Sequence, residues 1–377
     1  MSQRIAVCGN SMVPGSGAPS SAHGLRASGL RDGLVAAGFE VDIVSTASSI
    51  VSQMDRWQTR RIRVPGHWRI LQDQQYEARL NADYDVVIFP NWPVAKGFQK
   101  QGDLRIVYDF FSATLVEHAM ISGAEAIEEK RAEKLALLAQ ADFVIANGGV
   151  QAAYAREFLS ATGAKTLTGD IPAVRLSMPW ADPAPRRGER FRIFFGGFLQ
   201  AWTTGIRLAD LESLAEKHDA EVHAIGLGQH LHFREMSRVG RYRPKSDRVV
   251  LHEVASFESY QDLNRSADLA LDIFEPNEER RVSYSTRAVS SLSCGCPLLT
   301  MGFTEMGRMI EETGAGWTLE NFSVDALDDL LATLTARPEA VAEARARTRD
   351  FWERYVAPVR QVEPLVTMLK TGVSNVA

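Results

Sequence analysis

Short apolar runs alternate along the chain with longer amphipathic stretches. Strand-like segments begin at Arg4 and Phe39, and a helix-like stretch from His23 separates them. Two strands joined through a helix favour parallel pairing, because a parallel pair needs a long crossover connection. The strand-like segments that continue this alternation begin at Tyr84, Leu104 and Ala141. The first part of the chain therefore predicts an α/β domain built on a parallel sheet.

The alternation stops in a proline- and arginine-rich stretch and then resumes. Proline fixes local conformation without favouring helix or strand, which is typical of an interdomain linker. The later strand-like segments begin at Phe191, Ala220, Arg248, Ala267 and Cys296. The pattern thus predicts a first domain at 1–178, a linker at 179–190 and a second α/β domain at 191–351, with a mostly helical end of the chain.

Composition and charge narrow the class of protein. The 377 residues include 45% hydrophobic and 24% charged side chains, enough for two globular cores. A net charge of -5 argues against a protein held on nucleic acid by bulk charge. Only three cysteines occur, and no secretory signal or membrane-spanning apolar run is visible. We expect a cytoplasmic protein; Cys294 and Cys296 lack a second ligand pair, so no metal site is expected.

Two segments of the first domain contain candidate ligand-binding residues. A Gly/Ser/Pro-rich loop follows the first strand, where Gly15 and Gly17 allow close approach of backbone to a ligand; a merely flexible loop is the alternative. The segment Tyr108–Met120 follows another strand and holds Asp109 and His118, candidates for proton transfer at an acceptor hydroxyl. The alternative is that these polar residues cap a helix or are simply solvated.

Candidate anion-binding residues lie in the second domain. Gly196 and Gly197 follow a strand and allow a diphosphate to approach the backbone, unless they merely permit a tight turn. Ser285 and Thr286 are placed to cap a helix whose first turn contains Arg287. Because an arginine there opposes the helix dipole, a bound anion would explain it better than chance surface placement.

Several of these segments resemble the retaining glycosyltransferases of family 4. The resemblance rests on AAGFEVDIVS before the second strand, the strand followed by two glycines, and SLSCGCPLL at the end of a late helix. It covers nearly the whole chain and implies a GT-B fold: two Rossmann-like domains facing a central crevice, with the helix at 352–377 crossing back to the first domain. The glutamate pair of that family falls here on Ser283 and Ser290, so its donor contacts do not transfer.

The resemblance also implies a reaction. A sugar would pass from a nucleotide-sugar to a glycan or lipid-linked glycan acceptor, with retention at the anomeric carbon and without metal or other cofactor. Asp109 and His118 would act on the acceptor, and the donor would be bound by Gly196, Gly197, Ser285, Thr286, Arg287 and Arg281. Arg281 and Arg287 would replace the cations that usually follow the glycines. No nucleic-acid partner is expected.

Other readings remain open. A non-catalytic GT-B partner protein would explain the missing glutamates, and a nucleotide-sugar epimerase would use the same donor without an acceptor. An oxidoreductase is disfavoured because neither domain has the dinucleotide fingerprint. The segment 54–70 concentrates five arginines with Trp57 and Trp68, a combination that suits a peripheral contact with an anionic membrane; a solvated basic loop or a wall of the acceptor groove is the alternative.

Overall fold

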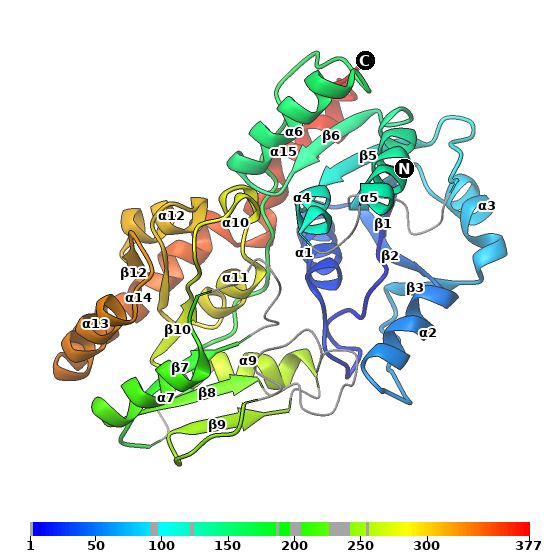
Figure 1. Ribbon diagram of the computed structural model, residues 1–377. Coiled ribbons are helices and arrows are strands. Elements are labelled where there is room, and N and C mark those ends of the chain that lie inside the picture. Colours follow the sequence, from blue (N-terminus) through cyan, green and yellow to red (C-terminus); the bar gives the residue numbers. More distant parts are fainter. Residues whose placement is uncertain are drawn as a thin grey trace. The chain divides into compact units, whose positions relative to one another are not determined.

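The computed structural model describes residues 3–90, 97–120, 124–185, 188–196, 205–225, 242–253 and 256–377. The chain forms two compact units (Figure 1). Unit 1 comprises Met1–Met178, Val282–Tyr284 and Tyr355–Ala377, and unit 2 comprises Pro179–Arg281 and Ser285–Arg354. Each unit is a parallel sheet with flanking helices. Among the described residues, no helix has both the length and the apolar character needed to span a bilayer.

The sheet of unit 1 has six parallel strands in the order β3-β2-β1-β4-β5-β6. Their bounds are β1 Arg4–Cys8, β2 Glu40–Thr46, β3 Trp68–Leu71, β4 Val86–Pro90, β5 Arg105–Phe110 and β6 Phe143–Ala146. The helices of this unit include α1 Ala22–Ala36, α2 Ala47–Arg56, α3 Asp73–Asp83, α4 Thr114–Ala119, α5 Ala124–Leu138, α6 Gly149–Thr162 and α15 Pro358–Thr371. Strand order reverses between β1 and β4, and open α/β sheets bind ligands at the carboxyl ends of strands at such a reversal.

The sheet of unit 2 repeats this topology, in the order β12-β11-β10-β7-β8-β9. Its strands are β7 Phe191–Phe195, β8 Ala220–Ile225, β9 Val249–His252, β10 Leu269–Asp272, β11 Leu298–Met301 and β12 Gly316–Leu319. The helices include α7 Leu208–Lys217, α9 Phe257–Arg265, α10 Glu278–Val282, α11 Thr286–Leu292, α12 Glu305–Thr313, α13 Val324–Ala336 and α14 Pro338–Tyr355. The reversal here lies between β7 and β10.

The end of the chain packs in unit 1, on α1. A Cβ atom at Gly33 would lie 2.5 Å from the Pro358 carbonyl oxygen and 2.7 Å from the Val362 side chain, so only glycine lets α15 approach this closely. Farther on, the Asn375 side chain accepts a hydrogen bond from the Val144 amide and donates one to the Val144 carbonyl on β6. The expected return of the terminal helix to the first domain is confirmed.

Candidate functional site

The loop after β1 is packed into unit 1. Met12 and Val13 are fully buried, and the Met12 carbonyl lies where a Cβ at Gly24 would be, against the first turn of α1. Gly15 and Gly17 have φ angles of +83° and +75°, a conformation that L side chains rarely adopt. The two glycines therefore define the path of an ordered loop at the β1 carboxyl end. Their contact with an acceptor stays a prediction.

Asp109 lies at the β5 carboxyl end, but its carboxylate faces into the protein. Arg26 on α1 donates to it twice, from Nε to Oδ2 at 2.7 Å and from Nη2 to Oδ1 at 2.9 Å, and both side chains are buried. Burial raises the pKa of Asp109, and the Arg26 charge opposes that rise. A carboxylate enclosed and bonded in this way is suited to positioning β5 against α1. It is poorly placed for direct proton exchange with an acceptor.

His118 lies near the end of α4 and is half-buried. Burial lowers its pKa, and the positive charge of Lys130 lowers it further. The imidazole is therefore mainly neutral at neutral pH, the state in which it is able to accept a proton. Of the two residues predicted to act on an acceptor, His118 is the one with a partly accessible side chain.

His23 joins this region from the first turn of α1. Its ring packs edge-on against Phe111, with the centroids 5.4 Å apart, and the Arg26 guanidinium lies 5.6 Å from the same Phe111 ring. Burial, followed by the charge of Arg56, lowers the pKa of His23 to about 4. The only sequence signal for it was its place directly after the Gly/Ser/Pro-rich loop. His23 thus adds a second neutral imidazole at the carboxyl ends of β1 and β5.

A buried lysine lies behind the other face of β5. Lys134 on α5 has no exposed surface, and its ammonium lies 4.2 Å from the Phe110 ring centroid and 4.8 Å from that of Phe158. The Tyr108 and Tyr154 rings are within 6.0 Å. Among the described residues, Lys134 Nζ has no hydrogen-bond acceptor. Burial lowers its pKa to about 7, although Glu117 raises it in part. Aromatic faces are thus the nearest stabilisation of its charge.

Replacing Lys134 with methionine should stabilise the protein most at low pH. Between about pH 7 and the ordinary lysine value of 10.5, the unfolded chain binds more protons at this position than the folded chain. Stability of the native protein therefore rises with pH in this window, by about 1 kcal/mol per unit. Urea unfolding at pH 6.5, 8 and 9.5 should show that the stability advantage of the Lys134→Met variant shrinks as pH rises. A difference independent of pH would contradict the buried-amine interpretation.

In unit 2, the carboxyl ends of β7 and β10 lie beside each other at the strand reversal. Gly196 follows β7 and is buried; a Cβ there would lie 2.3 Å from the Phe194 ring. The absence of a side chain is therefore required by packing, whatever else this glycine does. Gly197 lies outside the described residues.

Arg287 is held by an acidic residue that the sequence analysis missed. Its Nε lies 3.3 Å from Oδ1 of Asp272, the last residue of β10, and Asp272 is 1% exposed. Neither Asp272 oxygen has a hydrogen bond of good geometry within the described chain. The protein thus supplies an anion for Arg287, which accounts for an arginine in the first turn of α11 without a ligand. The contact leaves donor groups of the guanidinium available to a second anion.

The residues around Arg287 take the expected positions. Ser285 is the N-cap of α11, and its hydroxyl accepts from the Ala288 amide at 3.3 Å. Thr286 begins the helix, and its carbonyl accepts from the Ser290 hydroxyl at 2.9 Å. Arg281 on α10 is exposed, with its guanidinium 5.7 Å from the Phe303 ring centroid. Capping is thus established for Ser285, while donor contacts by these residues stay predictions.

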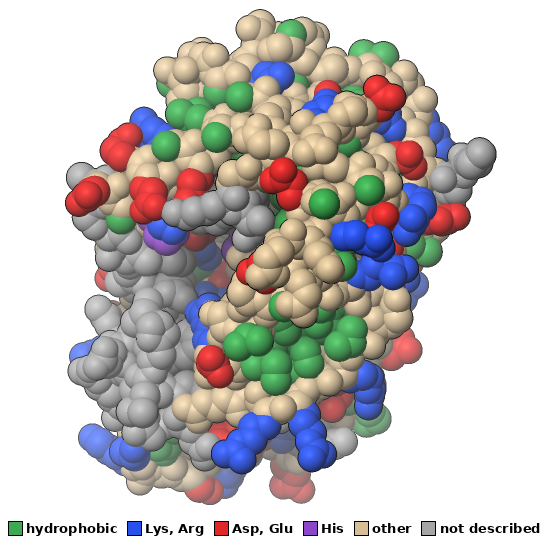
Figure 2. All heavy atoms as spheres, turned by 90° about the vertical axis from the view of Figure 1, so that its right-hand side faces the viewer, with side chains coloured by type: hydrophobic (Ala, Val, Ile, Leu, Met, Phe, Trp, Pro, Cys, Tyr) green, Lys and Arg blue, Asp and Glu red, His purple; other side chains and the backbone are tan. Residues whose placement is uncertain are grey.

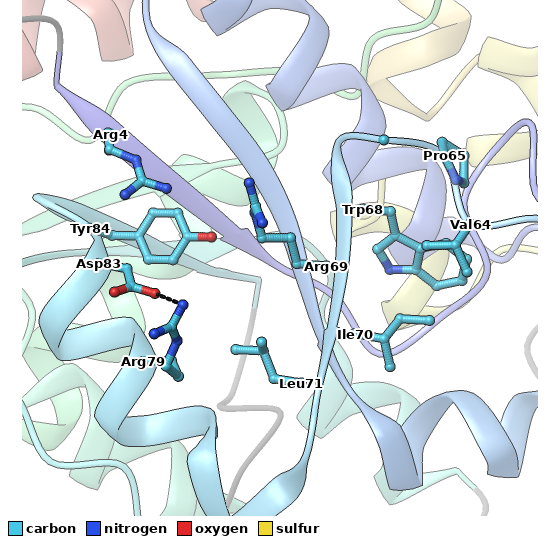
Figure 3. Close-up of a pocket in the computed structure, with 11 residues that line it drawn as sticks. Arg4, Val64, Pro65, Trp68, Arg69, Ile70, Leu71, Arg79, Asp83 and Tyr84 are labelled. Atoms are coloured by element: carbon cyan, nitrogen blue, oxygen red, sulfur yellow. Dashed lines mark ion pairs between the residues drawn. The ribbon is translucent and has the colours of Figure 1, made fainter.

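A surface pocket of about 430 Å³ lies elsewhere on unit 1. Figure 3 shows Arg4, Arg79 and Tyr84 on one side of β3 and Trp68 and Ile70 on the other. Its arginines already have carboxylate partners: Arg69 Nε lies 2.6 Å from Asp42 Oδ2, and Arg79 pairs with Asp83 at 2.8 Å. Arg4 and Tyr84 mark the amino ends of strands, so this pocket is separate from the carboxyl-end region of Asp109.

The two tryptophans of the basic segment at 54–70 are buried. Trp57 is 8% exposed and Trp68 2% exposed, and the Trp68 indole donates to the Ser45 hydroxyl at 2.9 Å. The expectation that these rings serve as interfacial aromatics is therefore wrong: both contribute to the core of unit 1. The periodicity of the segment gave no sign of this, because its apolar residues are isolated among arginines.

No group of three His, Cys, Asp or Glu side chains suited to a metal ion occurs among the described residues. The three cysteines are buried and unbridged. The expected independence of a metal ion stays a prediction.

Neither a protein-family model nor a curated protein matches the sequence. Solved structures are similar over nearly all of the chain. Sucrose-phosphate synthase from Thermosynechococcus elongatus superposes with a TM-score of 0.69 at 14% identity, over 98% of this chain and 100% of that one. An alpha-glucosyltransferase in complex with UDP-glucose and DNA containing an abasic site gives 0.64 at 12% identity, over 97% and 100%.

A third similar structure is Anabaena HepE in complex with UDP-glucose, with a TM-score of 0.62 at 11% identity over 98% of this chain and 100% of that one. Because one of these proteins was solved with DNA, the expected absence of a nucleic-acid partner gains no support here. At such low identities the likeness shows the fold alone. The chain has the two-domain α/β architecture of GT-B glycosyltransferases.

Proposed function

We propose that this protein is a glycosyltransferase that moves a sugar from a uridine diphosphate sugar to a hydroxyl of a glycan or lipid-linked glycan. The observation that carries the proposal is Arg287, held by buried Asp272 at the strand reversal of unit 2. This is the edge of an open α/β sheet where ligands bind. The choice of uridine draws on the similar structures that contain UDP or UDP-glucose.

On this proposal, unit 2 binds the donor. The Arg287 guanidinium has five N–H donors in a planar fork, and a single contact to Asp272 leaves several for the diphosphate oxygens. Arg281 adds a second cation on α10. The backbone of Gly196, directly after β7, adds a contact to the diphosphate. Positive charge held in place before the reaction stabilises the negative charge that grows on the leaving diphosphate.

Unit 1 binds the acceptor in this proposal. His118 and His23 are both mainly neutral at neutral pH because burial lowers their pKa values, so either is able to accept a hydrogen bond from an acceptor hydroxyl. Asp109 acts through Arg26 as a positioning residue, which holds β5 and its following loop against α1. In this proposal, the ordered loop with Gly15 and Gly17 forms a further side of the acceptor-binding region.

The reaction that we propose retains the anomeric configuration. The acceptor oxygen forms a bond to the anomeric carbon on the face from which the diphosphate leaves, as the carbon–oxygen bond to the diphosphate breaks. The bonding electrons go to the departing phosphate, and the acceptor proton passes to one of its oxygens. Arginines stabilise that phosphate, so the proposal requires no bound metal.

Product analysis tests this function. Purified protein incubated with UDP-glucose and a panel of glycan and lipid-linked acceptors should release UDP and form an α-linked product, identified by the proton coupling at the anomeric position. An altered free sugar nucleotide without transfer would indicate an epimerase. Binding of the acceptor with no affinity for any nucleoside diphosphate would indicate a non-catalytic partner protein.

A further inference from the structure

One surface of unit 1 combines exposed aliphatic side chains with arginines. Val51 on α2 is 57% exposed and Val64 is 50% exposed, and Ile62 between them in the chain is half-buried. Figure 2 shows hydrophobic side chains gathered in one patch on the face toward α2 and α3, with Lys and Arg side chains above and below it. We define the docking surface as α2 together with residues 57–66.

The charge on this surface is predominantly positive. Arg60, Arg61 and Arg63 are exposed, and none of them forms an ion pair with another described residue. Asp55 is the only acidic residue between 43 and 72. This contrasts with the pocket around β3, where each arginine has a carboxylate partner. Unpaired arginines beside exposed aliphatic side chains match a partner that is both anionic and apolar.

The docking surface is joined to the predicted acceptor loop. The Arg63 amide donates to the Ser16 carbonyl at 2.8 Å, and a Cβ at Gly15 would lie 3.7 Å from the Pro65 ring. A partner bound to this surface would therefore lie beside the loop of Gly15 and Gly17.

We infer that this surface docks on an anionic lipid bilayer. Arginines bind lipid phosphates while valine and isoleucine side chains enter the boundary between headgroups and acyl chains. Duplex DNA is the other anionic partner to consider, but phosphate backbone contacts do not require exposed aliphatic side chains. The inference rests on the proposed function for one point: a membrane surface is where a lipid-linked acceptor is found.

Co-sedimentation tests this inference without donor or acceptor. The full chain should bind vesicles of equal parts phosphatidylglycerol and phosphatidylcholine but not vesicles of phosphatidylcholine alone. The triple variant Arg60→Ser, Arg61→Ser and Arg63→Ser should lower the partition coefficient by about 100-fold, since each cation near an anionic surface contributes a factor of about five. Val51→Ser with Val64→Ser should also weaken binding. Circular dichroism checks that each variant is folded.

A matched control removes the same charge elsewhere on unit 1: Arg131→Ser, Arg156→Ser and Arg360→Ser, all exposed. This control should bind vesicles nearly as well as the native protein. Equal losses in both triple variants, no loss in the valine variant, or binding to a DNA duplex as tight as to vesicles would overturn the inference. Because vesicle binding is measured without UDP, failure here is distinct from failure of the transferase proposal.

Discussion

Replacing Arg287 with alanine should lower the rate of sugar transfer from UDP-glucose by about 100-fold or more, the usual effect of removing one preorganised donor to developing negative charge. The Arg287 side chain is 13% exposed, and its Nε lies 3.3 Å from Asp272 Oδ1. Its removal takes away the guanidinium but leaves Ser285 to cap α11. The loss should therefore appear in kcat/KM of the folded enzyme. Because the variant leaves Asp272 buried without its cation, it should also be less stable than the native protein.

Three variants distinguish this role from a general loss of charge. Arg337→Ala removes an exposed arginine that pairs with Glu339 near the start of α14, and it should keep full activity. Arg287→Lys keeps the charge but loses the planar fork, so partial activity is expected. Asp272→Asn tests the orientation of Arg287 and should raise KM for the donor. Equal rates of sugar transfer in the native protein and in Arg287→Ala would show that Arg287 does not bind the donor.

Replacing Asp109 with alanine should destabilise unit 1 by about 3–5 kcal/mol, the usual cost of leaving one partner of a buried ion pair without the other. Arg26 is 1% exposed, and its Nη1 already lacks a hydrogen-bond partner among the described residues. Without Asp109, its guanidinium would be buried with no anion. Since the free energy of unfolding of native proteins is about 5–15 kcal/mol, this loss is large.

Urea unfolding followed by circular dichroism measures the effect. The double variant Arg26→Met with Asp109→Leu is the control, because replacing both charges with apolar side chains removes the unpaired charge. It should recover much of the stability lost in Asp109→Ala. If Asp109→Ala were as stable as the native protein, Asp109 could not be the partner that neutralises Arg26. Direct action of Asp109 on the acceptor hydroxyl would then be the better explanation.

The alternation of apolar runs predicted both sheets apart from the edge strands β3 and β12, because parallel strands buried on two faces are almost continuously apolar. Ile5, Val7 and Ile88 are fully buried as their segments suggest. The return of the terminal helix was predicted only through the resemblance. The close packing of this helix on α1 requires a glycine at position 33, opposite Pro358. These two residues are more than 300 positions apart, so no local pattern indicates their contact.

The candidate site was less predictable, because the ion-pair partners of its residues are distant in sequence. Asp109 was identified as a polar residue at a strand end, but its partner Arg26 lies 83 positions earlier on α1. Asp272 closes an apolar strand and gave no signal as the partner of Arg287. Lys134 occupies one position in a charged helix and could not be distinguished by pattern from its solvated neighbours. Only the fold shows that four aromatic rings surround it.

Calorimetric titration of the full chain with UDP tests whether unit 2 binds the donor through Arg287. We expect saturable binding to the native protein, clear weakening in Arg287→Ala and unchanged affinity in Arg337→Ala. UDP should also raise the midpoint of thermal unfolding, by an amount that grows with the logarithm of its affinity at saturating UDP. The absence of heat and of any thermal shift with UDP, or equal affinity in Arg287→Ala, would contradict the assignment of unit 2 as a donor-binding domain built around Arg287.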